Sequence, residues 1–199
     1  HQYCLAIGTP KNWKISSKVK VFSKMKSVSR FLFISIFIIS CNKTALEKEF
    51  SCSSESFNGN TEKVIDVKKS FSIQIPKHWK TNLFFDKMQS SIYSADTTKQ
   101  LTETVLIDIT QLQIGYQFDA RFKKQLTLND SIQKLKNKHQ NAFKFKNKNA
   151  YYAISSGKKG NFTYQILNIF AKQNDTNSFH LKTEIYGNSD INKRFCKAI

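Results

Sequence analysis

The sequence FTYQILNIFAK, residues 162–172, is the most apolar strand-like segment of the chain. Its apolar residues fall on both sides of an extended backbone, as Ile166, Leu167, Ile169 and Phe170 show. A strand that is apolar on both sides is typical of the interior of a sheet whose two faces are covered. We therefore expect this segment to be a central strand, with other strands beside it and further elements packed on both faces.

Segments that alternate strictly between apolar and polar residues predict half-buried strands around this centre. Residues 71–75 alternate in this way throughout and residues 104–112, 143–146 and 179–186 over most of their length, and further strands are expected at 64–67, 89–94 and 151–154. Short turns join most of them, for example at 147–149 and 157–160. Successive strands with short turns predict a mostly antiparallel sheet.

Two helices complete the expected fold. The only long helical pattern spans residues 128–140, where Leu128, Ile132, Leu135 and His139 would share one face. A second helix is expected after Ser189 and Asp190, either of which could cap it. The expected order along the chain is a group of strands, one helix, a second group of strands and a final helix. This order predicts an α+β domain with helices packed on the sheet.

The segment Phe71–Pro76, FSIQIP, is followed by Trp79. This pattern resembles the F-x-I-x-x-P-x-x-W opening of PsbP-like domains, and the order of elements over residues 63–199 is also similar to that superfamily. The resemblance implies an antiparallel sheet sandwiched by helices. Members include photosystem II extrinsic proteins, bacterial lipoproteins and chaperone-like modules of secretion systems, which work mainly as binding or assembly modules. The resemblance implies no catalytic residues.

The segment MKSVSRFLFISIFIISC, residues 25–41, has the layout of a secretory signal. Lys26 and Arg30 precede an apolar core over residues 31–39, which is too short for an ordinary membrane span. The alternative interpretation of this apolar core is a long buried strand. The last four residues resemble a bacterial lipobox, in which the cysteine is acylated and cleavage falls just before it, so we expect Cys41 to be the lipidated mature N-terminus.

This segment divides the chain into four expected parts. Residues 1–24 are interpreted as sequence upstream of the true start, 25–40 as the signal peptide, 41–62 as a polar tether and 63–199 as the folded PsbP-like domain. The net charge is +18, and the first forty residues carry seven lysines or arginines and no acid. The remaining 25 basic and 14 acidic residues are interpreted as a solvated surface, which an AT-rich coding bias would also produce.

Cys52 and Cys196 remain after Cys4 and Cys41 are assigned to the leader and the anchor. An oxidising compartment permits a disulfide between them, and the alternative is two free thiols.

No catalytic, metal-binding or cofactor-binding pattern occurs in the sequence. His78, His139 and His180 lack metal-ligand spacing, and there is no nucleophile elbow, P-loop or dinucleotide-binding turn. Asp108 and Glu184 are interpreted as surface carboxylates. Lys144, Lys146 and Lys148 alternate with aromatics at a strand period, which argues against nucleic acid as a partner. We expect no catalytic residues, no metal and no cofactor.

The sequence therefore predicts a lipoprotein of the bacterial cell envelope, anchored in a membrane through Cys41 and facing the periplasm or the cell exterior. Its domain would bind an envelope protein or a ligand without catalysis. The alternatives are an envelope enzyme whose reaction no motif identifies, and a basic surface that binds anionic lipid or polysaccharide.

Overall fold

The computed structural model describes residues 45–52 and 60–199, so the signal segment, Cys41 and residues 1–24 lie outside the described residues. The elements in chain order are α1 (Ala45–Glu49), β1 (Thr61–Ile65), β2 (Ser72–Pro76), β3 (Lys80–Phe85), β4 (Gln89–Ala95), β5 (Leu106–Leu112), α2 (Ala120–Ile132), β6 (Lys136–Phe145), β7 (Lys148–Lys159), β8 (Phe162–Lys172), β9 (Ser178–Tyr186) and α3 (Ile191–Cys196).

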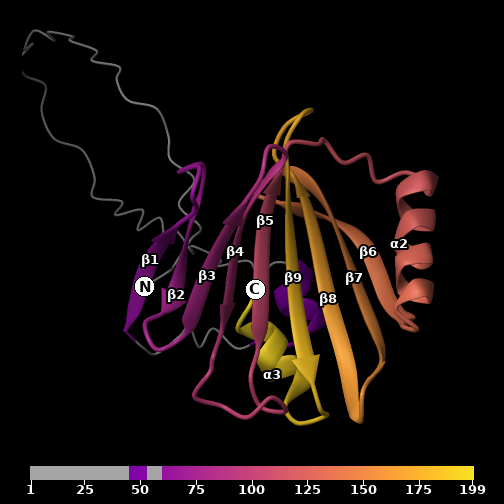
Figure 1. Ribbon diagram of the computed structural model, residues 1–199. Coiled ribbons are helices and arrows are strands. Elements are labelled where there is room, and N and C mark those ends of the chain that lie inside the picture. The colour runs from indigo at the N-terminus through magenta and orange to yellow at the C-terminus, as the bar shows by residue number, and fades with distance from the viewer. Residues whose placement is uncertain (1–44, 53–59) are drawn as a thin grey trace, which may run out of the picture. The chain divides into compact units, whose positions relative to one another are not determined.

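Seven of the strands form one antiparallel sheet in the order β3-β4-β5-β9-β8-β7-β6 (Figure 1). The segment expected at the centre, β8, is an interior strand between β9 and β7, and its buried side chains lie on both faces. β1 and β2 form a separate two-stranded antiparallel hairpin. The mostly antiparallel sheet with a few helices agrees with the predicted fold class.

One face of the sheet, which we call the inner face, carries a continuous core. α1 and α3 cover it over β7–β9, where Leu46, Phe50 and Phe195 pack on Tyr152 and Leu167. The β1–β2 hairpin covers the part over β4 and β5 with apolar side chains of β2 and with Trp79. This burial of aromatic and aliphatic surface is the main stabilising contribution to the fold.

The opposite, outer face is covered mainly at the end near α2. Phe122 of α2 contacts the rings of Tyr151 and Phe170 on this face, at centroid distances of 5.5 and 5.1 Å. Asp130 of α2 accepts a 2.6 Å hydrogen bond from Ser155. Phe122 and Asp130 thus join the helix to the sheet, and no residue of α2 is fully buried.

The prediction of a helix over residues 128–140 is wrong in its second half. α2 ends at Ile132, Lys134 adopts a left-handed backbone with φ of 55°, and β6 begins at Lys136. Leu135 is buried against Tyr164, whereas Ile132 is 71% exposed. Pairing with β7 supplies residues 136–145 with a ladder of hydrogen bonds, and this tertiary context overrides local helix propensity. The helical spacing of the apolar residues in this segment is therefore a coincidence.

The prediction of a polar tether over residues 41–62 is wrong for residues 45–52. These residues contain α1, and Leu46, Phe50 and Cys52 are buried in the inner core. A helix of five residues is too short to show a recognisable period. Its region has only two large buried apolar residues, Leu46 and Phe50, and they are surrounded by mostly polar sequence. The folded domain therefore includes residues 45–52 and does not begin at residue 63.

The C-terminal helix α3 follows Asp190, as expected, but the aspartate makes no capping hydrogen bond and has a left-handed backbone with φ of 48°. The buried Arg194 holds the helix instead. Its Nη1 donates to the carbonyl oxygens of Thr102, Thr104 and Tyr186 at 2.9, 3.2 and 2.9 Å. These bonds fix α3 against the β4–β5 connection and the end of β9.

A disulfide joins Cys52, just after α1, to Cys196 at the end of α3, across a sequence separation of 144 residues. Among the described residues, no helix is long and apolar enough to cross a lipid bilayer.

Replacing both Cys52 and Cys196 with alanine is expected to lower the free energy of unfolding by about 2–5 kcal/mol, because the unfolded chain loses a very long closed loop. Chemical denaturation followed by circular dichroism measures this change. A reducing agent should lower the stability of the wild type by a similar amount and leave the double variant unchanged. Equal stability of the oxidised wild type and the double variant would show that the disulfide is dispensable.

Candidate binding site

Large apolar side chains are exposed together around the β1–β2 turn, strand β3 and the β3–β4 turn. The exposed fractions are 64% for Phe85, 58% for Met88 and 57% for Phe84. Six of the twelve exposed large apolar residues of the described chain lie here: Ile65, Val67, Leu83, Phe84, Phe85 and Met88. A cluster of this kind marks an interaction surface more often than isolated exposed residues do.

The run Leu83-Phe84-Phe85 supplies three of these exposed residues. These residues form part of β3, an edge strand of the large sheet. Leu83 and Phe85 are on the inner side and Phe84 is on the outer side, as their pairing with β4 requires. Leu83 and Phe85 are 41% and 64% exposed although the β1–β2 hairpin covers other parts of the inner face.

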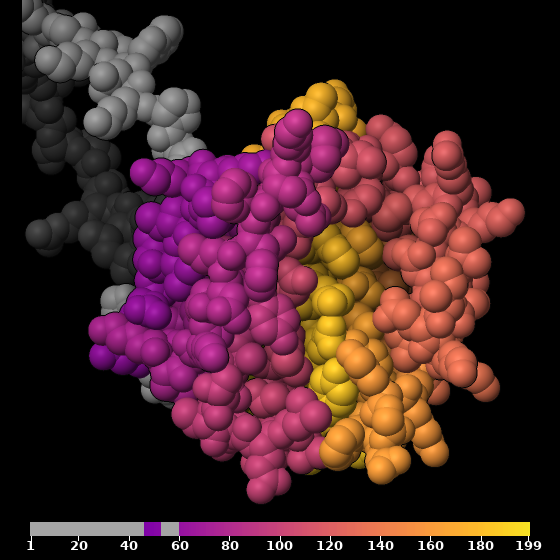
Figure 2. Space-filling model, in the orientation of Figure 1, coloured from indigo at the N-terminus to yellow at the C-terminus, as the bar shows by residue number. Residues whose placement is uncertain are grey.

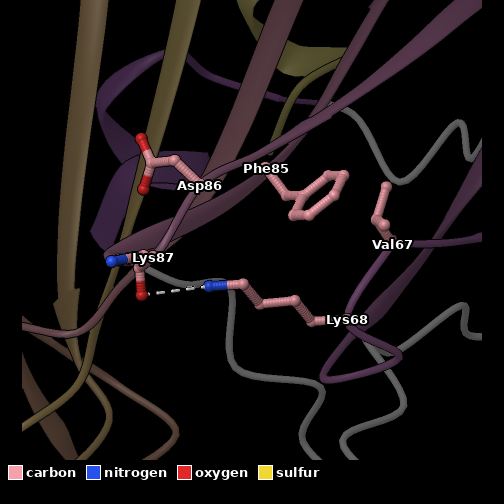
Figure 3. A pocket seen from close by; sticks show the side chains of 5 residues that line it. All are labelled: Val67, Lys68, Phe85, Asp86 and Lys87. Carbon is pink, nitrogen blue, oxygen red and sulfur yellow. Dashed lines mark hydrogen bonds between the residues drawn. The ribbon is translucent and has the colours of Figure 1, made fainter.

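An open pocket of about 680 Å³ lies within this apolar surface, lined by Val67, Lys68, Phe85, Asp86 and Lys87 (Figure 3). Figure 3 shows the ring of Phe85 directed toward Val67. The Lys68 ammonium donates a 3.3 Å hydrogen bond to the carbonyl oxygen of Lys87. An apolar pocket beside two lysine side chains can hold an apolar side chain of a partner, with the ammonium groups at its rim.

The carboxylate of Asp66 holds one wall of the pocket. It is buried and accepts hydrogen bonds from the backbone N–H groups of Lys68, Ser70 and Phe71 at 3.0, 2.7 and 2.8 Å. The Ser70 hydroxyl donates at 3.0 Å and the Ser90 hydroxyl at 2.7 Å. Because Ser90 belongs to β4, Asp66 fastens the β1–β2 turn to the large sheet.

A second aspartate holds the opposite wall. The carboxylate of Asp86 accepts hydrogen bonds from the backbone N–H groups of Met88 and Gln89 at 2.7 and 2.9 Å. This is the usual way in which an aspartate fixes a tight turn. Both walls are therefore ordered by the protein itself, so a partner would meet a preformed site.

The outer edge of β3 is also open. Among the described residues β3 pairs only with β4, and all its residues except Thr81 are exposed. An edge strand presents unpaired N–H and C=O groups that can pair with another extended chain. The apolar pocket and this free backbone edge together form what we call the β3 site.

A charged cluster on the outer face is a second candidate. Glu184 pairs with Lys182 at 2.8 Å and with Lys159 at 3.7 Å, and it accepts a 3.4 Å hydrogen bond from Tyr186. Figure 2 shows a hollow running along the strands of this face.

The ionisation of this cluster does not suit acid–base catalysis. Burial raises the pKa of Glu184, but hydrogen bonding and charge from Lys182 outweigh it, so the net pKa is lowered. A hydrogen bond with Tyr186 raises the pKa of Lys159 despite desolvation, and burial raises the pKa of Tyr164. Each shift moves the group away from neutral pH, whereas a general acid or base works best near it.

The three histidines are not brought together. His180 stacks on Phe170 at 4.4 Å, its Nε2 lies 2.9 Å from Asn168 Oδ1, and burial lowers its pKa to about 4. His139 lies in β6, 2.7 Å from Glu49, and not on a helix stripe. His78 lies 3.6 Å from Asp96. Within the described ranges, no three His, Cys, Asp or Glu side chains gather in a way that could hold a metal ion.

The two carboxylates considered from sequence are not paired either. Both lie on the outer face, but Lys182 stands opposite Asp108 in the register and Leu106 stands opposite Glu184. Asp108 accepts a 3.1 Å hydrogen bond from Thr110. They therefore form no acid–base pair.

No protein-family model and no curated protein matches the chain. Solved structures resemble it at low identity. A protein from Bacteroides thetaiotaomicron VPI-5482 is 14% identical, with a TM-score of 0.45 over 69% of this chain, which spans 46% of that protein.

A point mutant of the protein Mog1 is 8% identical, with a TM-score of 0.44 over 68% of this chain and 82% of Mog1. Cyanobacterial PsbP (CyanoP) from Synechocystis sp. PCC 6803 is 10% identical, with a TM-score of 0.43 over 67% of this chain and 84% of that protein. At these scores the likenesses carry no information about what this chain binds.

Asp66→Asn is expected to destabilise the protein by about 2–3 kcal/mol, because an amide cannot accept all the donors that surround the carboxylate. Burial raises the pKa of Asp66, but its hydrogen bonds outweigh burial and lower the pKa below 3.8. The contribution of Asp66 is therefore present above pH 3.8 and lost as the pH falls through the lower folded-state value. Urea denaturation across this range measures the difference.

The matched control is Asp175→Asn, whose exposed carboxylate pairs with Lys172. It should change stability little at any pH. An Asp66→Asn variant as stable as the wild type at neutral pH would contradict the structural role of the carboxylate.

Proposed function

We propose that this chain is an exported, lipid-anchored protein of the bacterial cell envelope that binds a partner without catalysis, through the β3 site. The observation that carries the binding function is the preformed apolar pocket beside the open edge of β3. Every strand between β3 and β6 is paired on both sides, so these two edges alone of the large sheet can accept a strand. β3 is the edge with exposed aromatic side chains.

The partner segment would be an extended chain that adds a strand beside β3. In this mode the backbone supplies the hydrogen bonds and pockets select alternate side chains. Phe85 and Val67 would contact an apolar side chain, and Lys68 and Lys87 at the rim favour a neighbouring acidic residue. An envelope protein with an exposed apolar and acidic extended segment therefore fits the β3 site best.

Two independent features support export and anchoring. The first is the order of basic residues, apolar core and Cys41 in residues 25–41. The second is the disulfide between Cys52 and Cys196, since structural disulfides persist in oxidising compartments and are rare in the cytosol. Both favour a location on the periplasmic or external side of a membrane, and the first alone favours Cys41 as the residue that carries the lipid.

Cells that express the full chain and grow with an alkyne-tagged fatty acid are expected to label the protein at Cys41. Cys41→Ala should abolish the label, and Cys52→Ala should retain it because that residue lies inside the folded domain. In-gel fluorescence after coupling to an azide dye gives the readout. An unlabelled wild type would contradict the lipid anchor and leave the binding site to be tested separately.

Phe85→Asp is expected to weaken the binding of an extended apolar peptide at least about tenfold, because it places a charge where an apolar side chain should pack. The peptide would be selected from a random displayed library against the purified protein, and its affinity measured by fluorescence anisotropy. The control Phe162→Asp alters another exposed aromatic residue, in the β7–β8 turn region.

N-methylation of alternate peptide amides should also abolish binding, since those N–H groups would pair with β3. Binding that survives both Phe85→Asp and N-methylation would rule out the β3 site. Failure to select any peptide with alternating apolar residues would count against an extended partner.

A further inference from the structure

Positive charge is distributed unevenly over the domain. Residues 60–119 contain seven basic and seven acidic residues, whereas residues 120–148 contain nine basic residues and one acidic residue. The final stretch, 149–199, contains seven basic and three acidic residues. A coding bias toward lysine would enrich all three stretches, so it does not account for a neutral first stretch beside a strongly basic second one.

The basic stretch forms one end of the large sheet. It comprises α2, the edge strand β6 that follows it and the turn that leads into β7, and α2 lies at this edge of the sheet (Figure 1). We call its nine exposed basic residues the α2–β6 surface: Arg121, Lys123, Lys124, Lys134, Lys136, Lys138, Lys144, Lys146 and Lys148.

Exposed aliphatic residues accompany these charges. Leu128 and Ile132 are one helical turn apart on α2 and are 51% and 71% exposed. Basic residues beside exposed aliphatic residues on a surface helix are typical of segments that lie in the interface of a membrane. Protection of the sheet edge from aggregation explains lysines on β6, but it does not explain those on α2.

The start of the folded domain lies close to this surface. The carboxylate of Glu49, at the end of α1, lies 2.7 Å from His139 of β6 and 3.4 Å from the hydroxyl of Tyr152. Ala45 is one helical turn from Glu49, roughly 6 Å along the axis. Cys41 precedes Ala45 by four residues, which span at most about 14 Å.

We infer that the α2–β6 surface docks on the anionic lipid headgroups of the membrane that holds Cys41. This inference rests on the proposed lipid anchor. An acyl chain at Cys41 keeps the membrane within about 20 Å of the Glu49 backbone, and the nearest strand edge is the lysine-rich β6. Anionic headgroups attract clustered lysines over about one Debye length, while Leu128 and Ile132 reach the interface between the headgroups.

The full lipidated protein in vesicles tests the inference. Acetic anhydride modifies exposed lysines, and mass spectrometry gives the rate at each one. In vesicles with about 30% phosphatidylglycerol, Lys124, Lys134, Lys136 and Lys138 should react several-fold more slowly than in pure phosphatidylcholine. The protection should disappear near 1 M salt, where the Debye length is about 3 Å. Lys63, Lys80 and Lys99, exposed on the neutral stretch, should react equally in both.

A matched pair of triple variants completes the test. Lys136→Gln, Lys138→Gln and Lys144→Gln together should remove most of the protection at Lys124 and Lys134. The control variant Lys63→Gln, Lys80→Gln and Lys99→Gln should keep it, although it loses the same number of charges. Circular dichroism confirms that both are folded.

Several results would overturn the inference. They are equal rates in the two kinds of vesicle, equal loss of protection in both triple variants, and protection of Lys63 and Lys80 in place of the β6 lysines. Protection that appears only in native membranes and not in protein-free vesicles would assign the surface to an acidic protein. These results leave fatty-acid labelling at Cys41 unaffected, so the anchor and the docking surface can fail independently.

Discussion

The disulfide between Cys52 and Cys196 is the constraint on which the arrangement of this domain depends. α1 has five residues and α3 has six, and neither helix is long enough to be stable alone. The bond holds both ends of the domain on the inner face, where Phe50 and Phe195 pack at 5.1 Å. It also holds α1 beside α3, although the two helices are far apart in the sequence. A covalent link thus keeps two short helices packed in the core.

A second constraint, the Asp66 carboxylate, acts at the other end of the sheet. Five donors surround it, and the hydroxyl of Ser90 connects the hairpin to β4. Without this connection the β1–β2 turn would be held mainly by apolar contacts further along the hairpin. The pocket therefore lies between two turns that are each held by an aspartate, Asp66 and Asp86. Order of this kind reduces the entropy that a partner must lose on binding.

Periodicity predicted the interior strands of the large sheet better than its edge strands or the first two helices. β8 and β9 were found because their side-chain patterns have one physical cause, the alternation of faces along a strand. The helix over 128–140 failed because Leu128, Ile132, Leu135 and His139 matched a helical spacing by coincidence. α1 was missed since two buried residues, Leu46 and Phe50, leave no detectable repeat in polar sequence.

The β3 site was harder to predict than the fold. The run Leu83-Phe84-Phe85 is apolar without alternation, and no signal in the sequence distinguishes it from a buried segment. Sequence alone predicts burial for such a run, because exposure depends on the neighbouring hairpin. Asp66 has no motif, and only the folded turn reveals its five donors. The basic stretch 120–148 was visible in the sequence, but its place beside α1 follows from the Glu49–His139 contact.

The strand order has a mechanical consequence. β3 and β6 are the two edges of a seven-stranded sheet, so six inter-strand spacings, or about 29 Å, separate them. If the β6 edge rests on lipid, the β3 edge lies above the membrane surface at a height similar to the thickness of the hydrocarbon core of a bilayer. The sheet then acts as a rigid spacer whose length is set by its number of strands. A partner bound at β3 would then lie at a defined distance from the membrane, and a partner segment that lies flat on the lipid could not bind there.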